Sequence, residues 1–219
     1  MTALQMQTAF EIEAKFIDSR MKPLSSDIFY WINRGVENFV RTRYSGNNPS
    51  NESFEQTQKR IDDLRTLVEE VSILSSIGIY KPNSYIFSLP SDYMFSLGEE
   101  VQISYNGNLI RTGVTEVNID RYRREIDNPF SEFKMHYGLA KPMRLFYDNT
   151  IEVISDGTYS VTYLYLRYLA VPQVVSLTNN CNLPTPTHPE IIKIAVGMYI
   201  ENTKDPRYQT IEHEINKQE

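Results

Sequence analysis

The chain of 219 residues contains few of the residues that metal and redox sites need. It has one cysteine, Cys181, and three histidines. A single cysteine excludes an intramolecular disulfide framework and a cysteine cage for zinc or an iron–sulfur cluster within one chain. The nine glycines are scattered and never bracket a Lys-Ser or Lys-Thr pair, so the glycine-rich phosphate loops of nucleotide enzymes are missing. We therefore expect neither a metal nor a cofactor.

Long apolar runs and an excess of positive charge are missing as well. No segment approaches the ~18 uncharged apolar residues of a membrane-spanning helix. Glu11, Glu13 and Lys15 interrupt the first twenty residues, unlike a signal peptide. We expect a soluble protein made inside the cell, with no membrane partner. The 22 basic and 28 acidic residues give a net charge of −6, which disfavours a nucleic-acid binder that relies on an overall cationic surface.

Tyrosine is the residue in excess. The chain has 15 tyrosines and one tryptophan, and the hydrophobic share is 41% even with tyrosine counted. The core is therefore expected to be lean. Apolar area that carries a hydroxyl group suits half-wet surfaces and interfaces between proteins.

The first third of the chain predicts three amphipathic helices. The first spans Ala3 to Asp18, and the second runs from a cap at Ser25–Asp27 to Gly46. The stripe of the second helix comprises Ile28, Trp31, Ile32, Val36, Phe39 and Val40. A loop over residues 45–53 precedes the third helix, which Ser53 and Gln56 cap and whose seam comprises Phe54, Ile61, Leu64, Val68 and Val71.

From Gly78 to Val175 the pattern predicts a mainly antiparallel β-meander. A strand at Tyr85–Leu89 is followed by a short helical turn within Ser91–Leu97 and by a strand that ends at the hairpin dipeptide Asn106-Gly107. The further strands are Met143–Tyr147, Ile151–Ile154 and Tyr159–Ala170, the last two joined across Ser155-Asp156-Gly157.

The long strand Tyr159–Ala170 has no clean polar face. Val161, Tyr163, Tyr165, Arg167 and Leu169 alternate with Thr162, Leu164, Leu166, Tyr168 and Ala170. Both faces are therefore expected to be covered. One cover is the helical layer, and the second is either another helix of this chain or a neighbouring subunit.

The C-terminal region crosses to a new position before a final helix. Residues 178–189 hold three prolines and three asparagines, and Thr187-His-Pro-Glu190 predicts a capping box for a helix through Tyr199 that Asp205-Pro206 ends. The fold class is α+β. Residues 1–80 and 178–206 form the helical part, 81–177 the β-rich part and 207–219 a polar tail. In that tail only Ile211 and Ile215 form a helical pair, so we expect it to order only against a partner.

The sequence contains no complete motif of the enzyme classes considered. His188-Pro-Glu190 matches half of a zinc deaminase signature, but the downstream cysteine pair is absent, and His213 lacks a second histidine at the metalloprotease spacing. No Gly-x-Ser-x-Gly elbow is present, and Cys181 has no basic neighbour to stabilise a thiolate. We predict no enzymatic activity and no catalytic residues.

One segment departs from the negative character of the chain. Residues 111–144 hold seven basic and five acidic residues, a local charge of +2. Arg121, Arg123 and Arg124 lie at its centre, interspersed with Asp120, Glu125 and Asp127. The arginines are candidates either for contacts to phosphates or for ion pairs within or between subunits.

The order of these pieces resembles a known family. Amphipathic helices, then Leu89-Pro-Ser-Asp-Tyr93, then strands ending in Tyr168-Leu-Ala-Val-Pro172, then the Pro-rich crossing and the helix at 187–199 resemble the head-to-tail adaptor and ring proteins of short-tailed bacteriophages. The nearest likeness is to the tail-tube ring or connector components of crAss-like phages.

The resemblance implies a structural virion part made in the host bacterial cytoplasm. Its partners would be copies of itself in a twelve-fold ring, the portal protein, other tail proteins, and double-stranded DNA that passes through the lumen without sequence-specific binding. It implies no catalytic residues. The net negative charge of the chain is compatible with a DNA conduit, because a lumen that bound phosphates tightly would retard the DNA.

Seven residues are candidates for subunit contacts: Trp31, Phe39, Arg121, Arg123, Arg124, Tyr163 and Tyr165. For Trp31 and Phe39 the alternative is the core of the monomer. Two rival functions stay open. A small hydrolase without a recognisable motif predicts a deep pocket of convergent polar groups in a monomer. A carbohydrate-binding module predicts exposed aromatic residues clustered in one groove.

Overall fold

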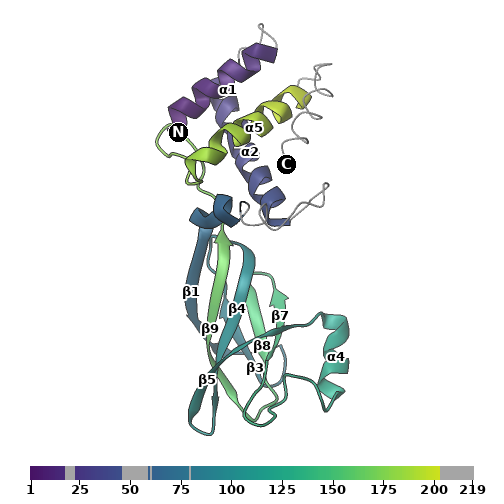
Figure 1. Cartoon of the computed structure of the whole chain (residues 1–219). Coiled ribbons are helices and arrows are strands. Elements are labelled where there is room, and N and C mark those ends of the chain that lie inside the picture. The colour runs from purple at the N-terminus through teal and green to yellow at the C-terminus, as the bar shows by residue number, and fades with distance from the viewer. Residues whose placement is uncertain (18–22, 46–58, 60, 79, 203–219) are drawn as a thin grey trace. The chain divides into compact units, whose positions relative to one another are not determined.

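A computed structural model describes residues 1–17, 23–45, 59, 61–78 and 80–202 (Figure 1). The chain divides into two compact units. We call Met1–Leu67 with Val171–Glu219 the helical unit, and Val68–Ala170 the β unit. The division follows Leu67, earlier than the expected boundary at residue 80, because strands begin at Val68. The residues of the expected polar tail, 207–219, and of the expected cap at Ser53 and Gln56 lie outside the described residues.

The helical unit packs three helices against one another: α1 (Ala3–Ile17), α2 (Ser25–Ser45) and α5 (His188–Asn202). All three were predicted, and the structure confirms them. Met6, Phe10 and Ala14 of α1 are buried at intervals of four, so this helix turns one narrow apolar stripe inward. Its opposite side leaves Phe16 86% exposed.

α2 and α5 approach closely at Gly35. A Cβ atom at this position would lie 2.9 Å from the carbonyl oxygen of Ile191 and 3.0 Å from Cβ of Ala195. Glycine costs helix stability, and here it permits backbone contact between two helices. Asn33 of α2 holds the crossing segment, since its side-chain oxygen accepts from the backbone N–H of Val175 at 2.7 Å.

The predicted capping box at the start of α5 is wrong, although the helix begins where expected. The backbone N–H and the hydroxyl of Thr187 both donate to the carbonyl of Pro184, at 3.0 and 2.8 Å. This closes a short 3-10 turn, η2 (Thr185–Thr187). Glu190 forms an ion pair with Arg43 of α2 instead of reaching back to Thr187.

The third predicted helix is wrong in its last part. Ile61–Leu64 is helical and leads into the 3-10 turn η1 (Arg65–Leu67), but Val68–Leu74 forms strand β1. This strand pairs antiparallel with the long strand near the end of the β unit, with Val71 opposite Leu166. Val68 and Val71 fit a helical seam, whereas Val71 and Ile73 fit the period of a strand, and the cross-strand partners favour the strand.

The β unit contains two sheets. The first has the order β1-β9-β4-β5, with β4 (Tyr93–Tyr105), β5 (Asn108–Gly113) and β9 (Ser160–Ala170). The second has the order β2-β3-β8-β7-β6: β2 (Ser76–Ile77), β3 (Ser84–Ser88), β6 (Thr115–Glu116), β7 (Met143–Tyr147) and β8 (Thr150–Ile154). All pairs are antiparallel except β6 with β7. The predicted α+β class and mainly antiparallel pairing are confirmed.

Two local predictions in this region are wrong and one is confirmed. Residues 93–97, expected within a helical turn, form the first part of β4, which pairs with β9 through register shifts. Ser155–Gly157 does not close a hairpin, because it carries the chain from β8 in one sheet to β9 in the other. The turn at Asn106-Gly107 is confirmed, with positive φ angles of 48° and 80°.

The core of the β unit lies between the two sheets. Val101, Leu164 and Leu166 of the four-stranded sheet pack with Phe87 and Ile151 of the five-stranded sheet, and all five are fully buried. The other face of the five-stranded sheet is covered by helix α4 (Ile119–Asp127), whose Tyr122 packs in a cluster that contains Met143, Leu145 and Ile154. Only the outer face of the four-stranded sheet lacks a covering layer among the described residues of this unit (Figure 1).

Candidate subunit interface

The outer face of the four-stranded sheet carries exposed aromatic and aliphatic side chains. Residues directly opposite one another in an antiparallel ladder point to the same face. Tyr163 of β9 lies opposite Leu74 of β1 and Gln102 of β4, while Leu109 of β5 lies opposite Ser104. Leu74 is 65% exposed, Leu109 64% and Tyr163 39%. We call this surface the outer sheet face.

Tyr165 of the outer sheet face contacts Tyr163 and Arg111. Its ring stacks with that of Tyr163 at a centroid distance of 6.5 Å, and the guanidinium carbon of Arg111 lies 4.1 Å from its centroid. Arg111 forms an ion pair with Glu100 through Nε, and its Nη2 lies 3.8 Å from a carboxylate oxygen of Glu70. This arrangement spans all four strands and fixes the aromatic rings before any partner arrives.

Both faces of the long strand were expected to be covered, and the structure shows that the two faces differ in burial. Leu164, Leu166 and Tyr168 face the core and are buried. Tyr163 and Arg167 face outward and are exposed. Of the two second covers considered, a helix of this chain is not found among the described residues of the β unit, and a neighbouring subunit stays a prediction.

The three candidate arginines lie on α4, which the sequence did not predict. Arg121, Arg123 and Arg124 are exposed, and the buried Tyr122 fastens the helix to the five-stranded sheet. Burial raises the pKa of Tyr122, the negative charge of Glu152 raises it further, and Arg123 opposes both. The hydroxyl of Tyr122 therefore stays protonated at neutral pH.

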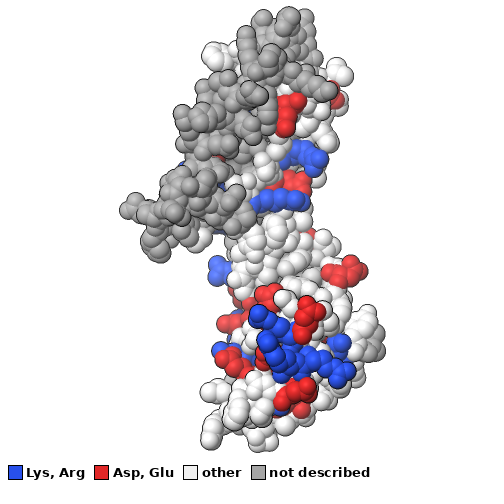
Figure 2. All heavy atoms as spheres, turned by 90° about the vertical axis from the view of Figure 1, so that its right-hand side faces the viewer, with Lys and Arg blue, Asp and Glu red and all other residues white. Residues whose placement is uncertain are grey.

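None of the three arginines forms an ion pair within the described part of the chain, so the expectation of pairs within the subunit is not met there. Contacts to another subunit and contacts to phosphates stay open. Figure 2 shows basic and acidic side chains interleaved on the side of the β unit where α4 lies. Exposed Ile119 and Phe130, at 56% and 86%, add apolar area to this surface, which we call the α4 surface.

Trp31 and Phe39 have different environments although both lie on α2. Phe39 is 1% exposed, and the guanidinium carbon of Arg43 lies 4.9 Å from its ring centroid. This is the alternative that the sequence offered, the core of the monomer, so Phe39 presents no surface to a partner. Trp31 is half-buried and makes an edge contact with Tyr199 of α5.

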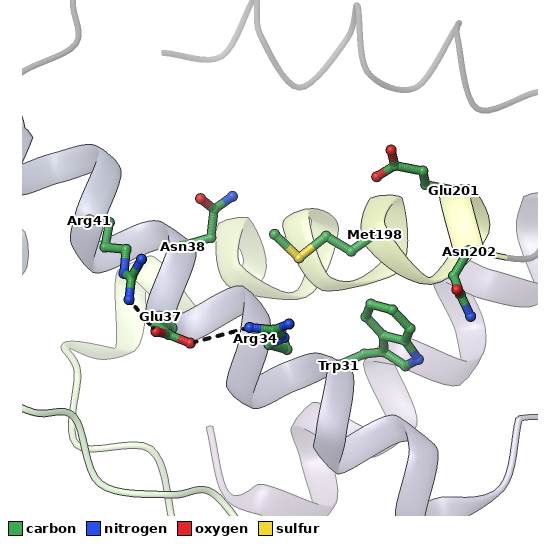
Figure 3. A pocket seen from close by; sticks show the side chains of 8 residues that line it. All are labelled: Trp31, Arg34, Glu37, Asn38, Arg41, Met198, Glu201 and Asn202. Carbon is green, nitrogen blue, oxygen red and sulfur yellow. Dashed lines mark hydrogen bonds and ion pairs between the residues drawn. The ribbon is translucent and has the colours of Figure 1, made fainter.

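Trp31 lines a groove on the helical unit. The groove has a volume of about 590 Å³. Its walls come from α2 and α5, and its lining residues are Trp31, Arg34, Glu37, Asn38, Arg41, Met198, Glu201 and Asn202 (Figure 3). Trp31 and Met198 provide the apolar part, while Arg34 and Arg41 both point toward Glu37. The groove therefore combines an aromatic end with a charged rim.

A comparison with protein families decides what this architecture belongs to. The model of a family described as phage tail ring protein 3/4, of crAss-like phages, matches residues 29–206, which is most of the chain. The chain belongs to this family. No curated protein matches it. The expected likeness to crAss-like phage ring proteins is thus confirmed, and this tail ring protein has a structural role in a phage tail and is a component of the virion.

His188 and Cys181, the residues whose side chains could be reactive, are buried in the tail ring protein. His188 is 2% exposed, its Nε2 lies 2.9 Å from the carbonyl oxygen of Leu183, and its Nδ1 lies 2.9 Å from the α-amino nitrogen of Met1. Burial lowers the pKa of His188, the Leu183 carbonyl raises it, and the Met1 ammonium lowers it. Burial also raises the pKa of the Cys181 thiol, which is the opposite of what a thiolate nucleophile needs.

The described ranges of the tail ring protein contain no candidate for a metal site or for a membrane-spanning helix. No group of three or more His, Cys, Asp or Glu residues there is placed to hold a metal ion. Likewise, none of the helices over the residues that the structure describes has the length and apolar character to cross a membrane.

Sequence reasoning missed three members of the outer sheet face: Leu74, Leu109 and Arg111. Each joins the face through its pairing with another strand, and a single strand's pattern does not contain that pairing. A usable signal for Arg111 was the predicted turn at Asn106-Gly107. This turn pairs Tyr105 with Asn108, and three residues further along each strand it places Arg111 across from Gln102.

Proposed function

We propose that this tail ring protein assembles into a closed ring, of twelve copies, that joins the portal to the tail and surrounds the DNA channel. The observation that carries the proposal is the outer sheet face. It exposes Leu74, Leu109 and Tyr163, and Arg111 contacts the ring of the neighbouring Tyr165. Such an exposed, preorganised aromatic surface is typical of a binding site for another protein. Membership in the tail ring family supports copies of the same chain and adjoining tail proteins as the partners.

The position of the two exposed surfaces suits a head-to-tail contact. In the β unit, the outer sheet face belongs to one sheet, and α4 covers the far side of the other sheet. The outer sheet face and the α4 surface therefore lie on opposite sides of the same two-sheet unit. A contact between two different surfaces, repeated by rotation, closes into a ring. Trp31 of the helical unit is a further contact residue in the proposal.

The charge of the chain supports a conduit for DNA over a DNA-binding protein. The net charge is −6. Phosphate contacts dominate the affinity of proteins for duplex DNA, so a ring built from such chains attracts DNA weakly and lets it pass without sequence-specific binding. We propose a purely structural part, without enzymatic activity, that is made in the cytoplasm of the host bacterium and incorporated at the neck or tail of the virion.

Co-assembly with the portal tests the proposal. Purified protein is mixed with portal complexes, and the products are imaged by electron microscopy. We expect added density with the rotational symmetry of a closed ring on one end of the portal, in stoichiometric amount. Portal complexes that stay undecorated over a range of protein concentration and salt would refute the proposed role.

A further inference from the structure

The four-stranded sheet has two long edge strands without the usual protection against pairing. Within the described chain, β1 pairs only with β9, and β5 only with β4. Natural proteins protect open edges with very short strands, lysine, proline or bulges. β1 has seven residues and β5 six, neither contains lysine or proline, and neither ladder has a register shift. The edge strands of the five-stranded sheet, β2 and β6, have only two residues each, so the two sheets differ in how open their edges are.

The backbone of β1 turns hydrogen-bonding groups toward the open edge at every second residue. The N–H of Ser75, which continues the β1 ladder, donates to the carbonyl of Thr162 at 2.9 Å. Bonded and outward-turned residues alternate along an antiparallel strand. The residues of β1 whose N–H and C=O groups point away from β9 are therefore Val68, Glu70, Ser72 and Leu74.

The backbone of β5 offers matching groups at the opposite edge. The two-residue turn at Asn106-Gly107 makes Tyr105 and Asn108 a bonded pair. The residues of β5 whose N–H and C=O groups point away from β4 are therefore Leu109, Arg111 and Gly113.

The two open edges run in opposite directions. Three successive antiparallel pairings, β1 with β9, β9 with β4 and β4 with β5, separate them. Two copies that lie side by side in the same orientation therefore bring β5 of one copy antiparallel to β1 of the next. This contact joins two different edges, so its repetition by rotation closes a ring.

We propose that β5 of one copy pairs with β1 of the next, with Leu109 opposite Leu74 of the neighbouring copy. The proposal rests on the ring described under the proposed function and specifies a lateral contact within it. In this register two leucines that are each more than 60% exposed cover one another, and Ile110 lies opposite Ile73, both at the rim of the core. A shift by two residues would place Leu109 opposite Ser72 and leave Leu74 unpaired.

The charges of the two strands are compatible with this register. β1 carries Glu69 and Glu70, and β5 carries Arg111. Glu70 lies opposite Gly113 of the neighbouring copy, where an added Cβ atom would meet nothing within 4 Å, and Glu69 lies beyond the end of β5. Within each copy Arg111 is already engaged by Glu70 and Glu100, so the pairing requires no new ion pair. No two charged residues lie opposite one another, and the outer sheet face stays accessible to adjoining tail proteins.

Disulfide trapping tests the pairing. Full-length Leu109→Cys and Leu74→Cys proteins are mixed in equal amounts, assembled on portal complexes and oxidised mildly. In the proposed register the two positions form a bonded pair with Cα atoms ~5.5 Å apart, within disulfide range. We expect a covalent dimer from the mixture and none from either variant alone, because the native Cys181 is buried.

Three further variants serve as controls. Ser72→Cys mixed with Leu109→Cys should not crosslink, because diagonal neighbours lie ~7–8 Å apart. Ser72→Pro, added to the Leu74→Cys protein, removes an N–H that points to the open edge, a position where a strand tolerates proline. It should abolish the crosslink while the circular dichroism of the free chain is kept. Ser72→Val keeps this N–H and should keep the crosslink.

The outcomes separate this proposal from the ring itself. Rings that form on the portal without the crosslink between positions 74 and 109 would overturn the edge pairing and leave the ring intact. A covalent dimer from Leu74→Cys alone, or a crosslink through position 72 in place of 74, would also overturn it. Where the portal stays undecorated, the ring proposal fails. The mixture is then oxidised in free solution at high concentration, where a crosslink supports the edge pairing and its absence overturns it.

Discussion

The guanidinium carbon of Arg111 lies 4.1 Å from the ring centroid of Tyr165, on the outer face of the four-stranded sheet. Arg111 belongs to β5 and Tyr165 to β9, with β4 between them. The arginine thus reaches across a strand to hold the aromatic ring, and its ion pair with Glu100 of β4 anchors it on the way. An aromatic ring fixed in the free chain loses little conformational entropy when a partner covers it.

Removing both rings from the outer sheet face should block assembly without unfolding the chain. Tyr163 is 39% exposed and the ring of Tyr165 lies against Arg111 on the same outer face, so Tyr163→Ser with Tyr165→Ser should lower the melting temperature only slightly. The measurement is the fraction of portal complexes decorated with a ring, beside thermal unfolding by circular dichroism. As control, Tyr137→Asn removes a fully exposed tyrosine at a positive φ of 52°, which asparagine tolerates. Normal decoration by the double variant would contradict the proposed contact.

The arginines of α4 should act between subunits. Charge reversal by Arg123→Glu leaves no ion pair broken inside the described chain, so its stability should change by no more than about 0.5 kcal/mol. Ring assembly should weaken, and assembly of the native protein should weaken with rising salt because exposed charges are screened. Arg65→Glu, at an exposed position of the helical unit, serves as control. A variant that assembles normally but is retained less on duplex DNA would assign the arginine to phosphates instead.

Arg43 should be essential for the stability of the helical unit. Its side chain is 5% exposed and contacts Asp63, at 3.3 Å, and Glu190 of α5. Arg43→Met leaves two largely desolvated carboxylates without their cation, and we expect a loss of about 2–4 kcal/mol in the free energy of unfolding. Arg41→Met on the same helix is the control. Because the side chain of Arg41 is 62% exposed, its pair with Glu37 should contribute less than about 1 kcal/mol. Urea titrations followed by Trp31 fluorescence measure the free energy of unfolding of both variants. Equal decreases in the two variants would contradict the assigned role of Arg43.

His188 should make the helical unit sensitive to acid. Burial lowers the pKa of His188 below the ordinary value of 6.5. Between the two pKa values the unfolded chain binds more protons than the folded one, so the free energy of unfolding decreases as the pH falls below 6.5 and is full above it. His188→Gln keeps a donor for the Leu183 carbonyl but cannot titrate. Urea unfolding on both sides of that pH should show a shallower pH dependence in the variant. An identical dependence in both proteins would exclude His188 as its source.

The sequence predicted the elements whose signals are local. α1, α2 and α5 have apolar residues at helical spacing, and Asn106-Gly107 closes its hairpin because both residues accept positive φ. The α4 helix was missed because its apolar residues are only Ile119, Tyr122 and Ile126 among six charged ones. Their spacing of three and four was present, but the charged residues were interpreted only as candidates for ion pairs or phosphate contacts, and no helix was predicted there.

What the sequence could not predict depends on pairing between distant segments. Val68 and Val71 fit a helical seam, and they become strand residues because Leu169 and Leu166 lie opposite them. The same holds for the candidate site. Tyr163 and Tyr165 were identified from one strand, whereas the surface around them is assembled from four strands that meet only in the fold. Tyr163 is exposed in the described chain, and which of the two covers lies over it stays a prediction.

Protection of the outer sheet face in the assembled ring tests the central claim most directly. The native Cys181 is buried, so Leu109→Cys, at a position 64% exposed in the free chain, introduces one reactive thiol. Its rate of maleimide labelling is measured in the free protein and in portal-bound assemblies, with Thr158→Cys as an exposed reference in the loop before β9. The account predicts rapid labelling of the free protein and strong protection of position 109 upon assembly. Equal labelling rates at this position in both states would contradict it.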